Sequence, residues 1–178
     1  MSTVKAPTLE LDSLTLSNFN LSSPPNQISA DWNVSMNFTN VDTHGYFEFS
    51  NIKVLIYYDK KIVGVTNLMS FDMSPKDPPM HVGGEFSSRL SSYIDDTMIT
   101  HITHSVNLTS TLIFNVEFSA LVKKTYRGFW GTDWWDPYLW VYNCENVELI
   151  FGSSDASKAN ILNGSGKCKK VSLPPWPS

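Results

Sequence analysis

The clearest structural signal is the stretch Ile28-Ser-Ala-Asp-Trp-Asn-Val-Ser-Met-Asn-Phe-Thr39, in which apolar and polar residues alternate without a break. Successive side chains of a strand point to opposite faces, so the six apolar residues share one face and the six polar residues share the other. The pattern predicts a strand with one buried face. Asn33 and Asn37, both acceptors in Asn-x-Ser/Thr motifs, fall on the polar face, which we expect to meet solvent.

The same period of two recurs along most of the chain. Strands are predicted over residues 9–16 with one bulge, in a hairpin at 46–65, and over 82–90, 109–126, 138–141 and 147–151. The proline-rich run at 74–79 predicts a loop. Residues 91–106 change to near-helical spacing and predict a short helix or an irregular crossover. Short strands with little helix are typical of an antiparallel β-sandwich.

Length and composition suit one globular domain. The chain has 178 residues, of which 42% are hydrophobic and 17% charged, with a net charge of −4. This balance argues against a nucleic-acid partner. We expect a flexible start at residues 1–7, a β-sandwich domain at 8–151 and a Ser/Lys/Pro-rich tail at 152–178. No apolar run is long enough for a spanning helix, and the start lacks the pattern of a signal peptide, so the chain as written is expected to be soluble.

Cysteines and glycan acceptors bear on the compartment. Cys144 and Cys168 fit either one disulfide around a loop of about 24 residues or two buried free thiols. The Asn-x-Ser/Thr acceptors are Asn20, Asn33, Asn37, Asn107 and Asn163. Used acceptors predict a domain that faces the secretory lumen and then the outside, whereas unused ones are chance occurrences in a chain rich in Asn, Ser and Thr.

No catalytic constellation is evident. The sequence lacks a nucleophile elbow, a phosphate-binding loop, a dinucleotide fingerprint and a Cys-x-x-Cys pair. His101 and His104 are three residues apart near Asp95 and Asp96, but no third metal ligand is specified, so we expect ordinary surface residues. We therefore predict a protein that is not an enzyme and that has no cofactor and no metal.

Two features favour a binding role. The aromatic run contains Trp130, Trp134, Trp135, Tyr138, Trp140 and Tyr142, of which we expect about half to face the core. Exposed members, with Trp130, Trp134, Trp135 and Tyr138 as candidates, suit stacking on sugars or contact with a membrane surface. Two basic clusters, Lys123-Lys124 with Arg127 and Lys167 with Lys169-Lys170, are either solvated faces or contacts for anionic lipid or acidic wall polysaccharide.

An ordered series of motifs resembles the second subgroup of plant late-embryogenesis-abundant proteins, which includes the harpin-induced-like and non-race-specific-disease-resistance-like members, also called the hydroxyproline-rich glycoprotein family. The series is Leu-Thr-Leu-Ser-Asn-Phe-Asn-Leu-Ser, Ile28-Ser-Ala-Asp-Trp32, a turn at Asn40, Ile52-x-Val54-x-Ile56-Tyr57-Tyr58, Ile62-x-Gly64, Phe71, Tyr126-Arg127-Gly128 and Cys144. It covers roughly residues 8–150. Two departures are Asn40-Val41-Asp42 in place of Asn-Pro-Asn, and no membrane helix before Thr8.

The resemblance implies an immunoglobulin- or fibronectin-like β-sandwich without enzymatic activity, associated with stress or defence. It implies presentation at the outer face of the plasma membrane, through a segment absent here, and a protein, anionic lipid surface or wall polymer as partner. A cytoplasmic, soluble location is the alternative. Two other functions stay open: a carbohydrate-binding or carbohydrate-active module that uses the Trp130 to Trp140 segment, and a soluble desiccation protectant without a specific ligand.

Overall fold

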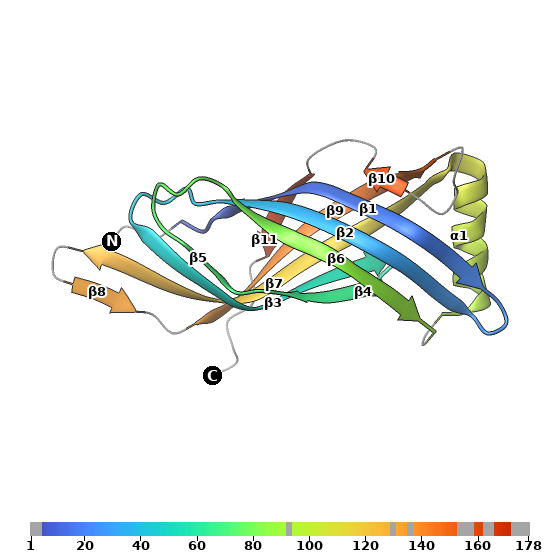
Figure 1. The fold of residues 1–178 in the computed structure, drawn as a ribbon, viewed down its shortest axis with the longest axis horizontal. Coiled ribbons are helices and arrows are strands. Elements are labelled where there is room, and N and C mark those ends of the chain that lie inside the picture. The colour runs from blue at the N-terminus through green and yellow to red at the C-terminus, as the bar shows by residue number, and fades with distance from the viewer. Residues whose placement is uncertain are drawn as a thin grey trace.

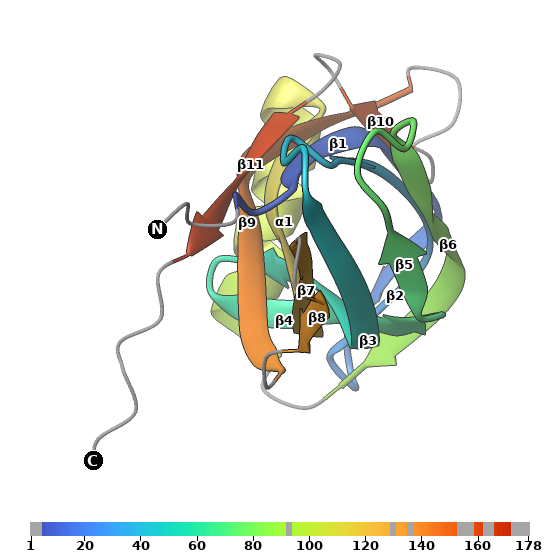
Figure 2. The ribbon, with the colours of Figure 1, turned by 90° about the vertical axis from the view of Figure 1, so that its left-hand side faces the viewer.

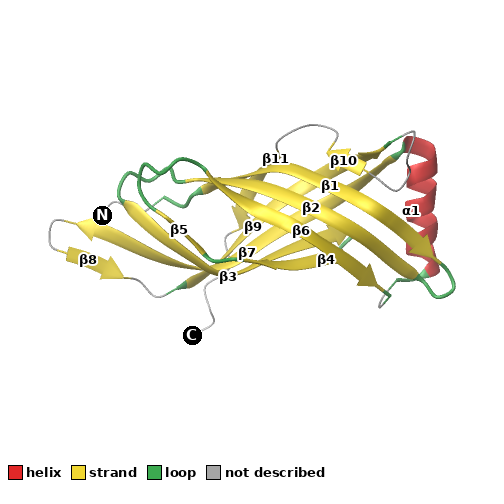
Figure 3. Cartoon of the chain, viewed as in Figure 1, coloured by secondary structure: helices red, strands yellow, loops and turns green. Residues whose placement is uncertain are grey.

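A computed structural model describes residues 5–91, 94–128, 131–134, 137–152, 159–161 and 166–171. These residues form antiparallel strands and one helix (Figures 1 and 3). The elements are β1 (Thr8–Ser22), β2 (Gln27–Thr39), β3 (Gly45–Tyr58), β4 (Lys61–Leu68), β5 (Phe71–Met73), β6 (Met80–Leu90), α1 (Asp96–Thr109), β7 (Thr111–Gly128), β8 (Gly131–Trp134), β9 (Tyr138–Phe151), β10 (Ala159–Ile161) and β11 (Gly166–Val171). The predicted antiparallel all-β class with one helix is confirmed.

One continuous sheet contains all of these strands. Its main path is β4-β3-β7-β9-β10-β1-β2-β6, while β11 pairs with both β1 and β9, β5 pairs with β3, and β8 pairs with β7. The sheet curls until its end strands approach each other, since a Cβ built on Gly64 of β4 would lie 3.2 Å from the Phe86 ring of β6. The result is a nearly closed, barrel-like sheet in which β10 and β11 join what would otherwise be two separate layers.

The alternating stretch in β2 lines the core as predicted. Its apolar side chains are almost fully buried, at 3% exposure or less; they are Ile28, Ala30, Trp32, Val34, Met36 and Phe38. Phe38 lies in a cluster of rings from across the sheet, with centroid distances of 4.9 Å to Phe118 and 5.4 Å to Tyr142. Tilted and edge-to-face ring pairs of this kind stabilise a core beyond the area that they bury.

Helix α1 stands across one end of the sheet (Figure 1). It was expected within 91–106 but begins later, because Asp95 is its N-cap: the Met98 backbone N–H donates to Asp95 Oδ1 at 2.8 Å. The buried side chains of Met98 and Ile102 attach the helix to the core. On β3, the Tyr58 hydroxyl lies 2.7 Å from His101 Nδ1 and ties the sheet to the middle of the helix.

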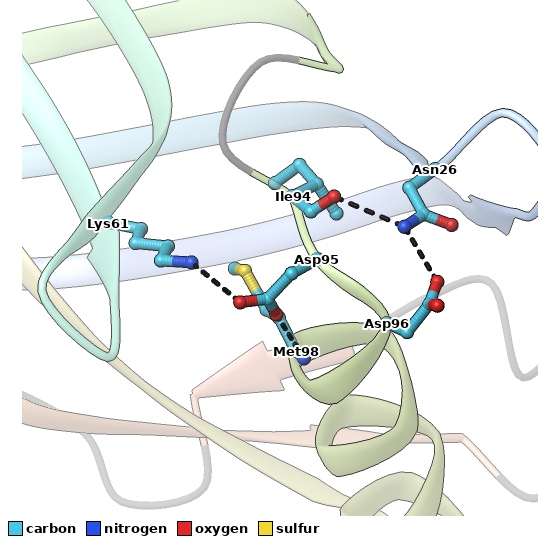
Figure 4. A network of polar contacts seen from close by, with 6 residues as sticks. All are labelled: Asn26, Lys61, Ile94, Asp95, Asp96 and Met98. Carbon is cyan, nitrogen blue, oxygen red and sulfur yellow. Dashed lines mark hydrogen bonds and ion pairs between the residues drawn. The ribbon is translucent and has the colours of Figure 1, made fainter.

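A polar network holds the start of α1 (Figure 4). Lys61 Nζ lies 3.6 Å from the Asp95 carboxylate. Asn26 Nδ2 donates to the Ile94 carbonyl at 3.2 Å and to Asp96 Oδ1 at 2.9 Å. One ion pair and two hydrogen bonds from Asn26 therefore hold the start of the helix.

The C-terminal part of the chain differs from the predicted tail. The two strands expected at 138–141 and 147–151 are one strand, β9, and both β10 and β11 lie in the sheet within residues 152–178. Cys144 and Cys168 form a disulfide with a Cα–Cα distance of 4.2 Å. The alternative of two free thiols is therefore wrong. The Gly- and Lys-rich sequence of β11 has no apolar alternation, because backbone pairing and the disulfide fix its position.

Candidate functional site

The inner face of the sheet changes character at the end away from α1, which Figure 2 turns toward the viewer. On β7, buried inward residues end at Val122, and Lys124 follows on the same face. On β9, the buried Trp140 is followed toward this end by Tyr138, which stands opposite Val122 and is 52% exposed. Apolar packing therefore gives way to cationic and aromatic side chains.

β11 brings a second lysine to the same place. Cys168 faces inward to its disulfide with Cys144, and Lys170 lies two residues further along the strand, opposite the buried Tyr142. Lys170 and Cys168 thus share the inner face. The disulfide and the pairing with β9 position Lys170 beside the aromatic residues of that strand.

Two ammonium groups converge on one indole ring. Lys170 Nζ lies 4.7 Å from the centroid of the Trp140 ring, and Lys124 Nζ lies 5.7 Å from the same centroid. Lys124 Nζ is also 5.8 Å from the centroid of the Tyr138 ring. All three distances are within the range of cation–π attraction. We call these four residues, Lys124, Tyr138, Trp140 and Lys170, the Lys–aromatic cluster.

The cluster brings two like charges near one ring. Burial, and after it the charge of Lys124, lowers the pKa of the Lys170 ammonium. Among the described residues no carboxylate forms an ion pair with Lys170. Two like charges held near one ring destabilise each other, and an anion placed between them would relieve that repulsion.

Strand geometry places the lysines of each basic cluster on different faces of the sheet. Lys123 points to the outer face, where it stands opposite Glu48 of β3, whereas Lys124 points inward. On β11, Lys167 and Lys169 lie on the face opposite to Lys170 and are exposed. One lysine from each cluster therefore joins the site. Alternation counted from Val122 and from Cys168 would have placed Lys124 and Lys170 on the inner face. No local sequence pattern, however, indicates that β7 and β11 converge.

Of the described side chains of the aromatic run, Trp140 and Tyr142 are buried and Tyr138 is exposed. Trp140 packs against Phe47 and Phe49, and the Tyr142 hydroxyl donates to the Pro7 carbonyl at 2.8 Å. Of the candidate ligand contacts, Tyr138 is exposed. Trp130 and Trp135 lie outside the described residues, and only the backbone of Trp134, in β8 opposite Thr125, is described.

The glycan acceptors differ in exposure. Asn20, Asn33 and Asn107 are exposed. Asn37 is half-buried, and its Oδ1 atom is buried without a hydrogen-bond partner among the described residues. Asn163 lies outside the described part of the chain. Room for a glycan is therefore clearest at the first three sites.

The histidine pair does not form a metal site in the described structure. His101 and His104 are both exposed on α1, and His101 contacts Tyr58. Within the described ranges, no group of three or more His, Cys, Asp or Glu side chains is placed to hold a metal ion. The described helix is also neither long nor apolar enough to cross a membrane.

Comparisons with known proteins leave the family open. No family model matches the chain, and no curated protein matches it. Among solved structures, the chain is similar to a protein from Archaeoglobus fulgidus at 15% identity, with a TM-score of 0.26, over 80% of this chain and 98% of that one. A TM-score this low carries no argument about fold or function. The resemblance to late-embryogenesis-abundant proteins stays a prediction.

Proposed function

We propose that this chain is a non-enzymatic binding domain that recognises an anionic partner through the Lys–aromatic cluster. The observation that carries the proposal is the convergence of Lys124 and Lys170 on the Trp140 ring. A net charge of −4 gives the molecule no general attraction for anions, so the attraction is local to this end. The half-exposed Tyr138 ring adds an apolar contact beside the two charges.

The biological setting is part of the same proposal. We assign the domain to the plant late-embryogenesis-abundant type, with a role in stress or defence at the outer face of the plasma membrane. The Cys144–Cys168 disulfide supports an oxidising compartment, because disulfides persist mainly outside the cytosol. Exposed acceptors at Asn20, Asn33 and Asn107 agree with that location.

The finer fold assignment also belongs here. We take the curled sheet to be an immunoglobulin- or fibronectin-like sandwich, with β4-β3-β7-β9 as one layer and β1-β2-β6 as the other. Packing across the interior supports this, since Trp32 of β2 meets Phe114 of β7 at a centroid distance of 5.3 Å.

Binding is tested with a charge-matched pair of double variants. Lys124→Gln/Lys170→Gln removes the cluster's cations, and Lys53→Gln/Lys167→Gln removes two exposed lysines from elsewhere. Each protein is assayed by sedimentation with anionic phospholipid vesicles and by calorimetry with oligogalacturonate, with neutral vesicles and a neutral glucan as references. We expect the wild type and the control to bind an anionic probe and the cluster variant to lose binding. Equal binding by both variants would contradict the proposal.

The compartment is tested by the intact mass of the protein from its native source, before and after reduction and after enzymatic removal of N-glycans. We expect a glycosylated, disulfide-bonded product with glycans at Asn20, Asn33 or Asn107. A mass equal to the bare chain with free thiols would place the protein in the cytosol and contradict the assignment.

A neutral carbohydrate is the second candidate ligand, because the Tyr138 ring is half-exposed at the edge of the site. This function predicts binding on a glycan array that needs no charge on the sugar. Trp134→Ala and Trp135→Ala should then abolish that binding, whereas unchanged binding would rule the candidate out.

A further inference from the structure

The sheet has an open seam between its two end strands, β4 and β6. In the described sheet, β4 pairs only with β3 and β6 only with β2, so each has one edge without a partner strand. At the start of β4 the Phe86 ring fills the seam, 3.2 Å from a Cβ built on Gly64. Further along, the strands face each other across a pocket of about 400 Å³, lined by residues 66–71 and 80–85. Both walls of this pocket are therefore strand edges.

The β4 wall lacks the usual protection of an edge strand. Natural sheets protect their edges against pairing with another chain by lysines, other charges or prolines. The sequence from Ile62 to Phe71 contains no charged residue and no proline. Ile62, Val65 and Met69 are exposed there, and Met69 reaches 89%. β4 thus has the properties of a strand that accepts another strand at its edge.

Gly84 of β6 also points to a ligand. A glycine inside a strand weakens it, and a fold requires one mainly for a left-handed backbone or for lack of space. Neither applies to Gly84: its φ lies outside the left-handed region, and Leu68 Cδ2 lies at an ordinary 3.9 Å from a Cβ built there. Gly83 differs, because its Cβ would collide with the Val34 carbonyl oxygen. A strand glycine that the fold does not need is typical of a place where another backbone approaches closely.

The side chains of the pocket favour an apolar anchor. Its apolar residues come from both walls and are Leu68, Met69, Phe71, Met80 and Val82. Methionine side chains adapt to different shapes and are frequent at surfaces that bind several partners. Glu85 lines the same pocket and adds negative charge, which favours a basic residue in the ligand.

An extended polypeptide segment matches both the walls and the pocket. Its backbone presents N–H and C=O groups along two opposite edges, as two facing strand edges require. Its side chains alternate, so every second one can enter the pocket while the others face solvent. A small apolar molecule would fill the pocket but would leave the backbone groups of both walls without partners.

We infer that the seam between β4 and β6 binds an extended segment of a partner protein, which adds a strand beside residues 66–71 and places an apolar side chain against Leu68 and Val82. Gly84 leaves room for the backbone of that segment, and a basic residue of the segment lies near Glu85. The seam is separate from the Lys–aromatic cluster, so this inference and the proposed function stand or fall independently.

The probe is a peptide selected from a random dodecapeptide library displayed on phage, with the full, disulfide-bonded chain as the target. The most enriched sequence is synthesised, and fluorescence polarisation measures its affinity. Two further versions of the peptide carry N-methyl groups on alternate backbone nitrogens, one version for each edge. The variant is Gly84→Val. Its matched control is Gly166→Val in β11, where a Cβ would meet no atom within 4 Å.

We expect selection to enrich peptides that have apolar residues at alternate positions and a basic residue. Gly84→Val should weaken binding of the selected peptide about tenfold, whereas Gly166→Val should change it less than about twofold. Each N-methylated peptide should also bind about tenfold more weakly, because strand addition depends on backbone hydrogen bonds. Thermal unfolding shows that each variant is folded, and Gly84→Ala serves as the test variant if valine prevents folding.

Failure to enrich any such peptide would overturn the inference. Equal affinity of the selected peptide for the two glycine variants would overturn it as well, because the peptide would then bind elsewhere. The same conclusion would follow if both N-methylated peptides kept their affinity, since strand addition needs their N–H groups.

Discussion

The two ends of the sheet differ in the charges that they bring together. At the α1 end, the Lys61 ammonium is paired with the Asp95 carboxylate, and buried helix side chains close the core. At the other end, Lys124 and Lys170 approach the same indole ring, where burial, and after it the charge of Lys124, lowers the pKa of Lys170. The first arrangement brings opposite charges together. The second brings like charges together, which is why we assign function to that end.

The largest stability effect should come from the α1 end. Ile102 is 2% exposed on the inner side of α1, and Ile102→Ala should lower the free energy of unfolding by about 2–5 kcal/mol through lost burial and a cavity. Urea denaturation followed by circular dichroism measures the loss. The control is Leu108→Ala on the same helix, at a side chain 70% exposed, which should change stability little. Equal effects would mean that α1 does not close the core.

The disulfide links stability to the functional end. Cys144→Ser with Cys168→Ser opens a loop with a sequence separation of 24 and should cost roughly 3 kcal/mol of unfolding free energy. Because the bridge fastens β11, the same double variant should also bind oligogalacturonate more weakly. Reduction of the wild type is the control and should reproduce both changes. Unchanged stability and binding would show that backbone pairing alone holds β11.

Asp95 should have a smaller effect that depends on pH. The hydrogen bond from the Met98 N–H lowers the pKa of Asp95, burial opposes this, and the charge of Lys61 adds to it. A folded-state pKa below the unfolded value contributes stability above the unfolded value, which is lost as the pH falls through the folded value. Asp95→Ala should therefore lower the melting temperature at neutral pH and less in acid. Asp95→Asn, which keeps a capping oxygen, should lose less; a difference independent of pH would contradict this account.

The sequence predicted the all-β class because apolar and polar residues alternate along the strands that form the core. The alternation from Ile28 to Phe38 identified the buried face of β2, and the near-helical spacing identified α1. It could not identify β11, whose sequence Gly-Lys-Cys-Lys-Lys-Val has no periodic apolar residues. That strand is held by pairing with β1 and β9, which are distant in sequence.

The site was predictable only in its parts. The sequence indicated lysine clusters, aromatic residues and a cysteine pair, but neighbouring residues such as Lys123 and Lys124 go to opposite faces. Which lysines meet at Trp140 depends on the register of β11 with β9, where Lys170 stands opposite Tyr142. Long-range register of this kind is set by the whole sheet and not by any local stretch of residues.

The smallest stability effect should come from the cluster. Lys170→Gln removes a charge that burial and Lys124 already disfavour, so the free energy of unfolding should stay within about 0.5 kcal/mol of the wild type. Chemical denaturation beside Lys167→Gln measures this. A loss as large as that of Ile102→Ala would mean that Lys170 is structural, and the contrast between the two ends would fail.

The most direct test is the pKa of Lys170, measured by NMR of the side-chain ammonium with and without oligogalacturonate. In the free protein we expect it to lie below the usual value of a lysine, because burial, and after it the charge of Lys124, disfavours the ammonium. A bound carboxylate favours the charged ammonium, so the ligand should raise the pKa of Lys170. No shift of the Lys170 pKa with the ligand would contradict the assignment of this end as the binding site.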